Sequence, residues 1–412
     1  MEQTPRSVLR FLIIAVGGVL FATVPMSLGT ASASRSPFIS PASSEYVALG
    51  DSYSSGEGLQ SNAATYIPPS NADGCHRSVD AYPVSVAENL NLSLGQFETY
   101  GSGGFVACSG ATSKDLFNGE NGEPSQLSAL SPETHWVTIT DGGDDLHFSN
   151  VLIACLGVRA SVTVGAATKS YTQSGVVHEG KTCDSYLDSA TSLLKVTQGT
   201  SPEEAELEHV YAQIFVRAPN AEIAVLNYPQ LFTQSSPPAF CPVAGGASLF
   251  SVFKVRSAQL GIGYSKSQVS KFNLVESELD SAIASAVSDM SALGHNIQLV
   301  DVNSLTKASA IPCNVATNGQ SDINTLRFSV SSPLRTLVDN CHFDLAHLLS
   351  LRPFVSCPAN EADVFLQHIV ATETFHPKRG ANNTMARAVE ALFDQAPTST
   401  TTLNPNLSTT MP

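Results

Sequence analysis

The hydrophobic positions of the chain form short apolar runs that are separated by longer amphipathic segments. The runs are bounded by turn residues, and most lack the regular polar alternation of a half-exposed strand. Such runs are typical of parallel strands that are buried on both faces of a sheet. Four strands are expected at residues 46–50, 136–140, 222–227 and 297–302, and a fifth near 97–100 or 104–107.

Two amphipathic segments between these runs predict helices. Ser201 and Pro202, followed by two glutamates, are typical of a capped helix start. Further along, Val275, Leu279 and Ile283 recur at i+4 spacing, which predicts a helix with one apolar stripe against the core. This alternation of strands and helices predicts a three-layer α/β/α fold with its active site at the carboxyl ends of the strands.

The first residues have the pattern of a secretory signal peptide. Arg6 and Arg10 precede an apolar stretch at 11–28, and an A-x-A cleavage pattern ends at residue 33. An uncleaved anchor is the alternative, because the stretch is long enough to span a bilayer. We expect cleavage and secretion. The rest is expected to be a short linker (34–44), one domain (45–396) and a disordered Thr-, Ser- and Pro-rich tail (397–412).

Composition limits the partners of the chain. Its formal net charge is −15, so nucleic acid and anionic membrane surfaces are not expected partners, and we expect a monomer without a stable membrane span. The eight cysteines are an even number, as expected for disulfides in a secreted protein. A zinc site is not expected, because there is no C-x-x-C pair and the histidines lack ligand spacing.

One apolar run ends at a candidate nucleophile. Ser52 follows Gly50 and Asp51, so its hydroxyl would lie at the carboxyl end of the first strand, near backbone N–H groups that bind an anion. Far along the chain, Glu373 precedes His376 by three residues. Histidine can activate a serine as general base, and a carboxylate can orient the histidine. The chain has no G-x-S-x-G elbow, which disfavours an ordinary α/β-hydrolase.

Four blocks of the chain resemble those of the GDSL or SGNH hydrolases, and more narrowly the secreted lipase-like members from actinobacteria. The resemblance covers most of the chain from residue 46 to about 393, and it implies the SGNH hydrolase fold, an α/β/α sandwich with a mainly parallel, flavodoxin-like sheet. The blocks are residues 50–58, 107–113, 137–145 and 373–377.

The resemblance also implies roles for single residues. Ser52 would be the nucleophile and His376 the general base, with the N–H groups of Ser52 and Gly110 in the oxyanion hole. The third block of the family reads Gly-Gly-Asn-Asp, but Asp144 replaces the asparagine here, so its part in the oxyanion hole stays open. In the fourth block the family has Asp or a backbone carbonyl in place of Glu373, and either group is expected to orient the histidine.

Spacing alone does not fix the disulfide connectivity. The resemblance supports Cys75–Cys108 and Cys241–Cys313, and proximity in the sequence favours Cys155–Cys183 and Cys341–Cys357. Residues 150–200, after the third block, are expected to be an insertion that either shapes the substrate site or forms a surface excursion.

Together these observations predict a secreted serine esterase or lipase that hydrolyses lipid or short acyl esters through an acyl-enzyme on Ser52. No cofactor or metal is expected, because the acidic run at 141–147 lacks the alternate-residue spacing of a calcium loop. Two alternatives remain. One is a carbohydrate acetyl esterase, and the other is a catalytically impaired binding protein of the cell envelope, which Asp144 favours.

Overall fold

The computed structural model describes the part of the chain that contains the predicted α/β domain. The signal peptide, linker and tail that the sequence predicts lie outside the described residues, as do Glu373, Cys341 and Cys357. The described residues are 45–59, 66–67, 74–99, 103–164, 167–173, 175, 177–197, 199–233, 237–248, 258–306, 310–313, 321–324, 342–343, 355–356 and 374–394.

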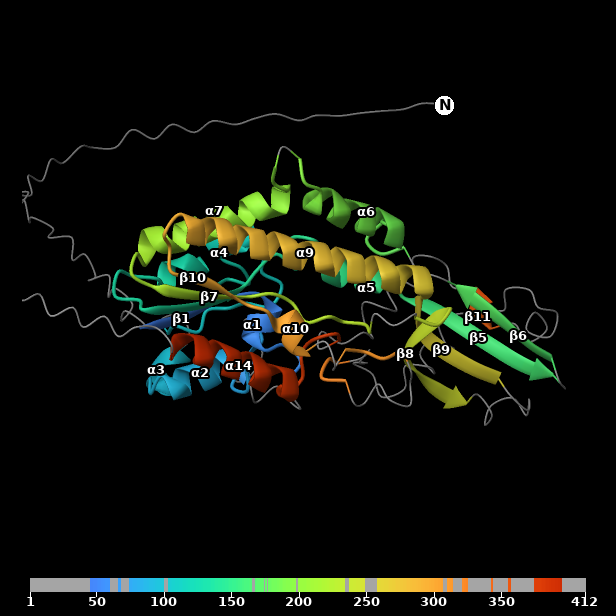
Figure 1. Cartoon of the computed structure of the whole chain (residues 1–412). Coiled ribbons are helices and arrows are strands. Elements are labelled where there is room, and N and C mark those ends of the chain that lie inside the picture. Colours follow the sequence, from blue (N-terminus) through green and yellow to red (C-terminus); the bar gives the residue numbers. More distant parts are fainter. Residues whose placement is uncertain are drawn as a thin grey trace, which may run out of the picture. The chain divides into compact units, whose positions relative to one another are not determined.

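Four parallel strands form the central sheet (Figure 1). Beyond β1, Phe105 adds a single parallel bridge to Ala48. With that bridge the strand order is the flavodoxin-like one, which reverses between β1 and β4, and ligand sites form outside the carboxyl ends of strands at such a point. In spatial order the strands are β1 (Tyr46–Gly50), β4 (Trp136–Thr140), β7 (Glu222–Leu226) and β10 (Ile297–Val300).

Helices cover both faces of this sheet, as the three-layer prediction requires. Alternate residues of β1 face opposite layers: Val47 and Leu49 lie in the core cluster with α7 and α9, whereas Tyr46 and Ala48 lie in the cluster with α2 and α14. Figure 1 shows these helix pairs on opposite sides of the strands. Their bounds are α2 (Tyr82–Asn89), α7 (Pro202–Arg217), α9 (Lys266–Ala292) and α14 (Arg379–Phe393).

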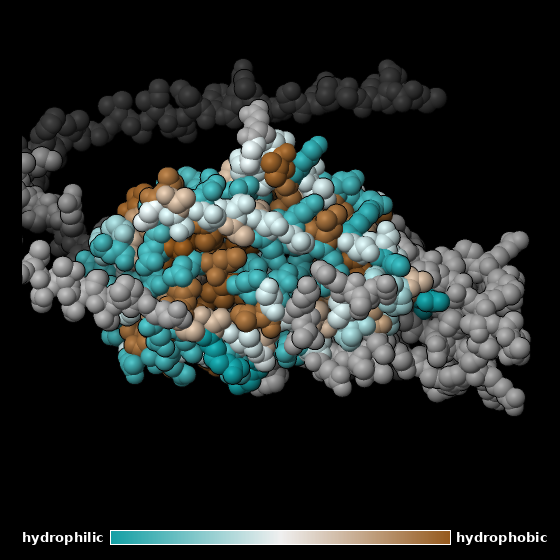
Figure 2. Space-filling model, viewed as in Figure 1, coloured by the Kyte–Doolittle hydropathy of each residue, from teal (hydrophilic) through white to brown (hydrophobic). Residues whose placement is uncertain are grey.

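The two predicted helices are present with the expected caps. The hydroxyl of Ser201 accepts from the N–H of Glu204, whose carboxylate accepts from the N–H of Ser201, and this capping box starts α7. The apolar stripe of α9, which includes Leu279 and Ile283, is buried. Figure 2 shows hydrophobic residues gathered on the face of the molecule that lies between α9 and α14.

A second sheet was not expected from the sequence. Four antiparallel strands lie in the order β6-β5-β9-β8, and two of them come from the predicted insertion at 150–200. Apolar residues do alternate in β5 (Val158, Ala160, Val162) and in β9 (Leu260, Ile262, Tyr264), but small or polar residues separate them, and the prediction of fully buried strands did not include such half-exposed segments. The bounds are β5 (Gly157–Val164), β6 (Ala167–Gln173), β8 (Phe240–Ser248) and β9 (Ala258–Ser265).

Short elements connect the two sheets and the helices. The fifth expected strand is reduced to the Phe105 bridge, because Phe97 ends a helix instead. The strand expected at 297–302 stops at Val300, because Val302 begins a helix. The short elements are α1 (Ser52–Ser55), β2 (Tyr66–Ile67), β3 (Arg77–Ser78), α3 (Leu94–Phe97), α4 (Ser113–Asn118), η2 (Gln126–Ala129), α5 (Phe148–Cys155), α6 (Cys183–Leu194), α10 (Val302–Thr306), β11 (His342–Phe343) and β12 (Val355–Ser356).

Three of the four predicted disulfides are present in the described residues. They are Cys75–Cys108, Cys155–Cys183 and Cys241–Cys313. The first pairs the segment before β3 with the second sequence block, and the second joins α5 to the start of α6. Within the described ranges, no helix combines the length and the apolar character needed to cross a bilayer.

Candidate active site

The turn after β1 presents Ser52 at the carboxyl end of the sheet. Gly50 has φ +119°, and a Cβ at this position would collide with the carbonyl oxygen of Thr140 on β4. The chain can therefore turn here only with glycine. Asp51 then caps the short helix α1, which begins at Ser52. The N–H groups of Ser52 and Gly110 have no hydrogen-bond partner among the described residues, so both are free to donate.

Asp51 connects this turn to β4 and to the segment after β7. Its Oδ1 accepts from the hydroxyl of Thr140 at 2.6 Å and from the N–H of Tyr53 at 2.9 Å. Its Oδ2 accepts from the hydroxyl of Tyr228, the second residue after β7. Burial raises the pKa of Asp51 to about 6, although these three hydrogen bonds lower it. The carboxyl group is therefore an anchor inside the protein, and it fixes the serine-bearing turn against β4 and β7.

The histidine turn is held by its own backbone and by a distant segment. Nδ1 of His376 donates to the carbonyl of Thr374 at 3.1 Å, which orients the imidazole through a backbone group. Phe375 has φ +64°, a left-handed conformation that is unusual for an aromatic residue. It is held there because its N–H donates to the carbonyl of Asn324 at 3.0 Å, and Asn324 in turn donates to the carbonyl of His376 at 2.8 Å.

Two further contacts attach this turn to the serine segment. The side-chain amide of Asn324 donates to the carbonyl of Gly58 at 3.1 Å. The hydroxyl of Tyr53 donates to the carbonyl of Phe375 at 3.1 Å, and its ring lies 5.5 Å from that of His376. The first and last sequence blocks are thereby joined through residues that are next to the serine and the histidine.

Ser52, Asp144 and His376 line one cleft of about 580 Å³ that is open to solvent. The structure therefore brings together three of the five predicted site residues. Gly110 does not line this cleft, and Glu373 lies outside the described residues. The second block nevertheless lies beside the turn, because the N–H of Cys108 donates to the carbonyl of Gly50 at 2.9 Å.

The third sequence block, residues 137–145, supplies three acidic side chains near the serine-bearing turn. Asp141 is buried and accepts from the hydroxyl of Ser113 at 3.0 Å, and Asp145 accepts from the N–H of Ser113 at 2.9 Å. Asp144 is half-buried and faces the cleft. Its pKa is raised well above the ordinary value by burial first, and then by the negative charges of Asp51, Asp145, Glu120 and Asp115. A protonated Asp144 is therefore favoured, and such a group can donate a hydrogen bond.

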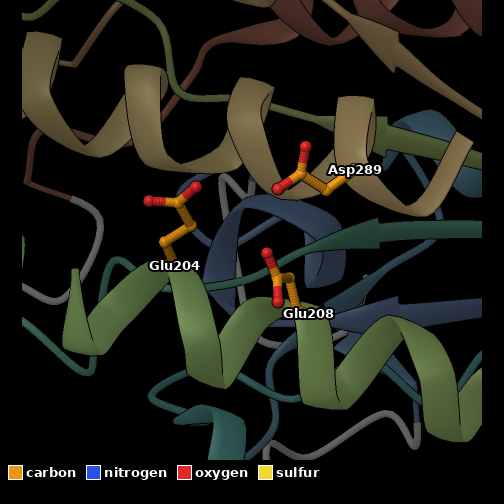
Figure 3. A group of neighbouring side chains, drawn as sticks. All are labelled: Glu204, Glu208 and Asp289. Atoms are coloured by element: carbon orange, nitrogen blue, oxygen red, sulfur yellow. The ribbon is translucent and has the colours of Figure 1, made fainter. Parts of the chain in front are cut away.

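A separate group of carboxylates lies between α7 and α9. Glu204 and Glu208 on α7 point toward Asp289 on α9 (Figure 3), with one oxygen of each within 4.8 Å of the others. Burial raises the pKa of Glu208, and the charges of Asp289 and Glu204 raise it further. Glu204 already serves the capping box, and none of the three lines the cleft. The acidic run at 141–147 does not form such a group among the described residues.

Sequence reasoning missed three residues that build the site. Tyr228 receives the N–H of Gly143 at 3.0 Å while it donates to Asp51, so it joins the first and third blocks. Its position directly after a predicted strand was the available signal, because parallel strands end at one edge of the sheet. Asn324 and Glu276 gave no signal, since the first lies far from any block and the second lies inside a helix that reads as core packing.

Comparisons with known proteins agree with the four sequence blocks. No family model matches the chain. Lipase 1 of Streptomyces coelicolor is 32% identical over 222 residues, which cover 54% of this chain and 62% of that lipase. A lipase of Streptomyces rimosus is 31% identical over 221 residues, which cover 53% of this chain and 64% of that lipase. The match thus spans less than two thirds of either lipase.

A solved structure shows the same fold. The crystal structure of phospholipase A1 from Streptomyces albidoflavus NA297 superposes with a TM-score of 0.50 at 20% identity, and the match covers 84% of this chain and 98% of that chain. The sequence matches and this fold confirm the resemblance to the lipase-like GDSL or SGNH hydrolases of actinobacteria. The flavodoxin-like α/β/α architecture implied by that resemblance is confirmed as well.

Proposed function

We propose that this chain is a serine ester hydrolase that cleaves lipid or short acyl esters through an acyl-enzyme on Ser52. The observation that carries the proposal is the single cleft lined by Ser52 and His376, two residues that lie at opposite ends of the sequence. The similarity to Streptomyces lipases supports the same reaction class. The aliphatic and aromatic residues of the cleft wall support an acyl chain as part of the substrate.

In the proposed mechanism, Ser52 attacks the acyl carbonyl while Nε2 of His376 takes its proton. The hydrogen bond from Nδ1 to the carbonyl of Thr374 fixes the tautomer in which Nε2 carries no proton and can act as base. The imidazolium then protonates the leaving alcohol, and the neutral ring activates water for deacylation. The N–H groups of Ser52 and Gly110 stabilise the oxyanion, and protonated Asp144 is the third donor.

Because a backbone carbonyl already orients the imidazole, Glu373 is assigned a supporting role. Glu373→Gln is expected to lower kcat much less than His376→Ala does. Equal losses in the two variants would instead make the carboxylate the essential orienting group.

We also propose that the protein is secreted and acts as a monomer. The three disulfides support an oxidising compartment.

The test combines turnover with active-site labelling. The purified protein is assayed on p-nitrophenyl esters from acetate to laurate and treated with a fluorophosphonate, with Ser52→Ala as the control. We expect turnover that depends on chain length, and a label on the peptide that contains Ser52. A label at Ser52 without turnover would favour the ligand-binding alternative. Turnover that persists in Ser52→Ala would refute the proposal.

A further inference from the structure

A buried carboxyl group lines the same cleft as the proposed catalytic residues. Glu276 on α9 is 5% exposed and lines the cleft together with Ser52 and His376. Ser149 and a group of apolar residues also line it. The apolar residues are Leu146, Phe148, Leu152, Leu231, Val275 and Leu279. A carboxyl group that is buried among apolar residues normally has hydrogen-bond partners within the protein for its oxygen atoms.

The two oxygens of Glu276 have different surroundings. Oε2 accepts from the N–H of Leu231 at 3.1 Å, whereas Oε1 is buried and has no hydrogen-bond partner among the described residues. Burial raises the pKa of Glu276 well above its ordinary value and the charge of Asp280 raises it further, although the hydrogen bond from Leu231 lowers it. The protonated form is therefore favoured. Since Oε2 accepts a hydrogen bond, the proton belongs on Oε1, which then lacks an acceptor.

The neighbouring carboxyl group of α9 shows what a fully paired group looks like. Asp280, one turn further along, accepts from the N–H of Tyr228 at 3.2 Å through Oδ1 and from the amide of Asn303 at 2.6 Å through Oδ2. Both carboxyls thus hold the loop after β7, but only Glu276 lines the cleft and only Glu276 keeps an unpaired oxygen. Leaving a buried donor unpaired costs stability, so its partner is expected to come from a ligand.

We infer that Glu276 is a specificity-determining residue, whose Oε1 donates a hydrogen bond to an oxygen atom within the acyl chain of the substrate. The inference rests on the proposed ester hydrolysis and names its substrate class as esters of oxygenated acids, such as hydroxyacyl, oxoacyl or alkoxyacyl esters. An all-carbon chain fills the same apolar space but leaves Oε1 without an acceptor.

The experiment moves one oxygen atom along an otherwise constant chain. Wild-type protein is assayed on p-nitrophenyl octanoate and on a set of analogues in which an ether oxygen replaces one methylene at each position. We expect one or two adjacent positions to raise kcat/KM by about 3- to 10-fold over octanoate, the range of one net hydrogen bond. Glu276→Leu should abolish that preference. Glu276→Gln should keep part of it, because the amide can still donate while its oxygen accepts from Leu231.

Asp280→Asn is the matched control. It alters a carboxyl that holds the same loop without lining the cleft, so the ratio of oxygenated to plain substrate should not change at mildly acidic pH, where Glu276 keeps its proton without the charge of Asp280. Equal rates on all analogues, or the same preference in Glu276→Leu, would overturn the inference while leaving ester hydrolysis intact. A preference that follows oxygen atoms only in the alcohol part would overturn it as well. Absence of turnover and of Ser52 labelling would instead show that the proposed function itself is wrong.

Discussion

The replacement Asp144→Asn tests how the proposed oxyanion hole works. An ionised carboxylate has no proton to donate, whereas a protonated one donates as an asparagine amide does. Burial and the charges of four neighbouring carboxyl groups raise the pKa of Asp144, so the wild type keeps its donor to a higher pH than an ordinary aspartate does and loses it as the pH rises through the raised pKa. Asparagine supplies a donor at every pH.

The size of the effect follows from the value of one oxyanion donor. Losing such a donor costs about 2.7–4 kcal/mol of transition-state stabilisation, or roughly 100- to 1000-fold in kcat. The two proteins should therefore have similar kcat wherever Asp144 is protonated. Above the raised pKa, where Asp144 is ionised, the variant should be faster by roughly 100- to 1000-fold.

The assay is a pH–rate profile of kcat on one soluble ester, with melting curves to confirm that both proteins stay folded. Asp145→Asn is an informative control, because the charge of Asp145 is one of the groups that raise the pKa of Asp144. Its removal should move the loss of activity to lower pH, opposite to the change in Asp144→Asn. If Asp144→Asn loses activity at the same alkaline pH as the wild type, protonated Asp144 is not a donor.

Three other perturbations are expected to give clear results. Ser52→Ala and His376→Ala should each remove nearly all covalent turnover, and the double variant should be little worse than either in kcat, because the two residues act as one unit. Glu203 is 3% exposed, and burial raises its pKa from 4.5 to about 8, so the stability that its protonated form provides below pH 4.5 is lost as the pH rises through 8. Urea unfolding should show the wild type less stable at pH 9 than at pH 5 by on the order of 4 kcal/mol from this group, with Glu203→Gln removing that part of the difference. Gly50→Ala should destabilise by about 2–3 kcal/mol in the same assay, whereas Gly95→Ala, at a helix position with no atom within 4 Å of the added Cβ, should be nearly neutral.

The sequence predicted those parts of the fold that have a strong local signal. The strands β1 and β4 have the predicted bounds, because each apolar run ends at Gly50 or Thr140 before an aspartate. The capping box at Ser201 likewise marked the start of α7. The antiparallel sheet was missed, because its strands alternate apolar with small or polar residues instead of forming the continuous apolar runs of the central strands, and because their pairing is set by contacts distant in the sequence.

The residues of the candidate site also fall into two groups, those with a local sequence signal and those without one. Ser52 and His376 belong to short motifs, so the sequence identified both, and the structure places both on one cleft. Tyr228 and Glu276 belong to no motif. Their surroundings follow from strand order and from the packing of α9 over the sheet, which no local pattern encodes. Local sequence therefore predicts the reacting groups better than the groups that position and select the substrate.

The hydrogen bonds of Asn324 that hold the histidine turn affect when activity can arise during folding. Asn324 binds both the loop at Gly58 and the backbone around His376, so the proposed base reaches the serine only after the last part of the chain has docked. The contact between Gly58 and Asn324 closes a long loop, which has an entropic cost. We expect this contact to form after the central sheet has folded and brought the two segments close together. A chain released early from synthesis, or clipped before residue 321, would keep strands β1 to β10 and lack hydrolytic power. Hydrolytic activity would thus arise only when synthesis of the polypeptide is complete.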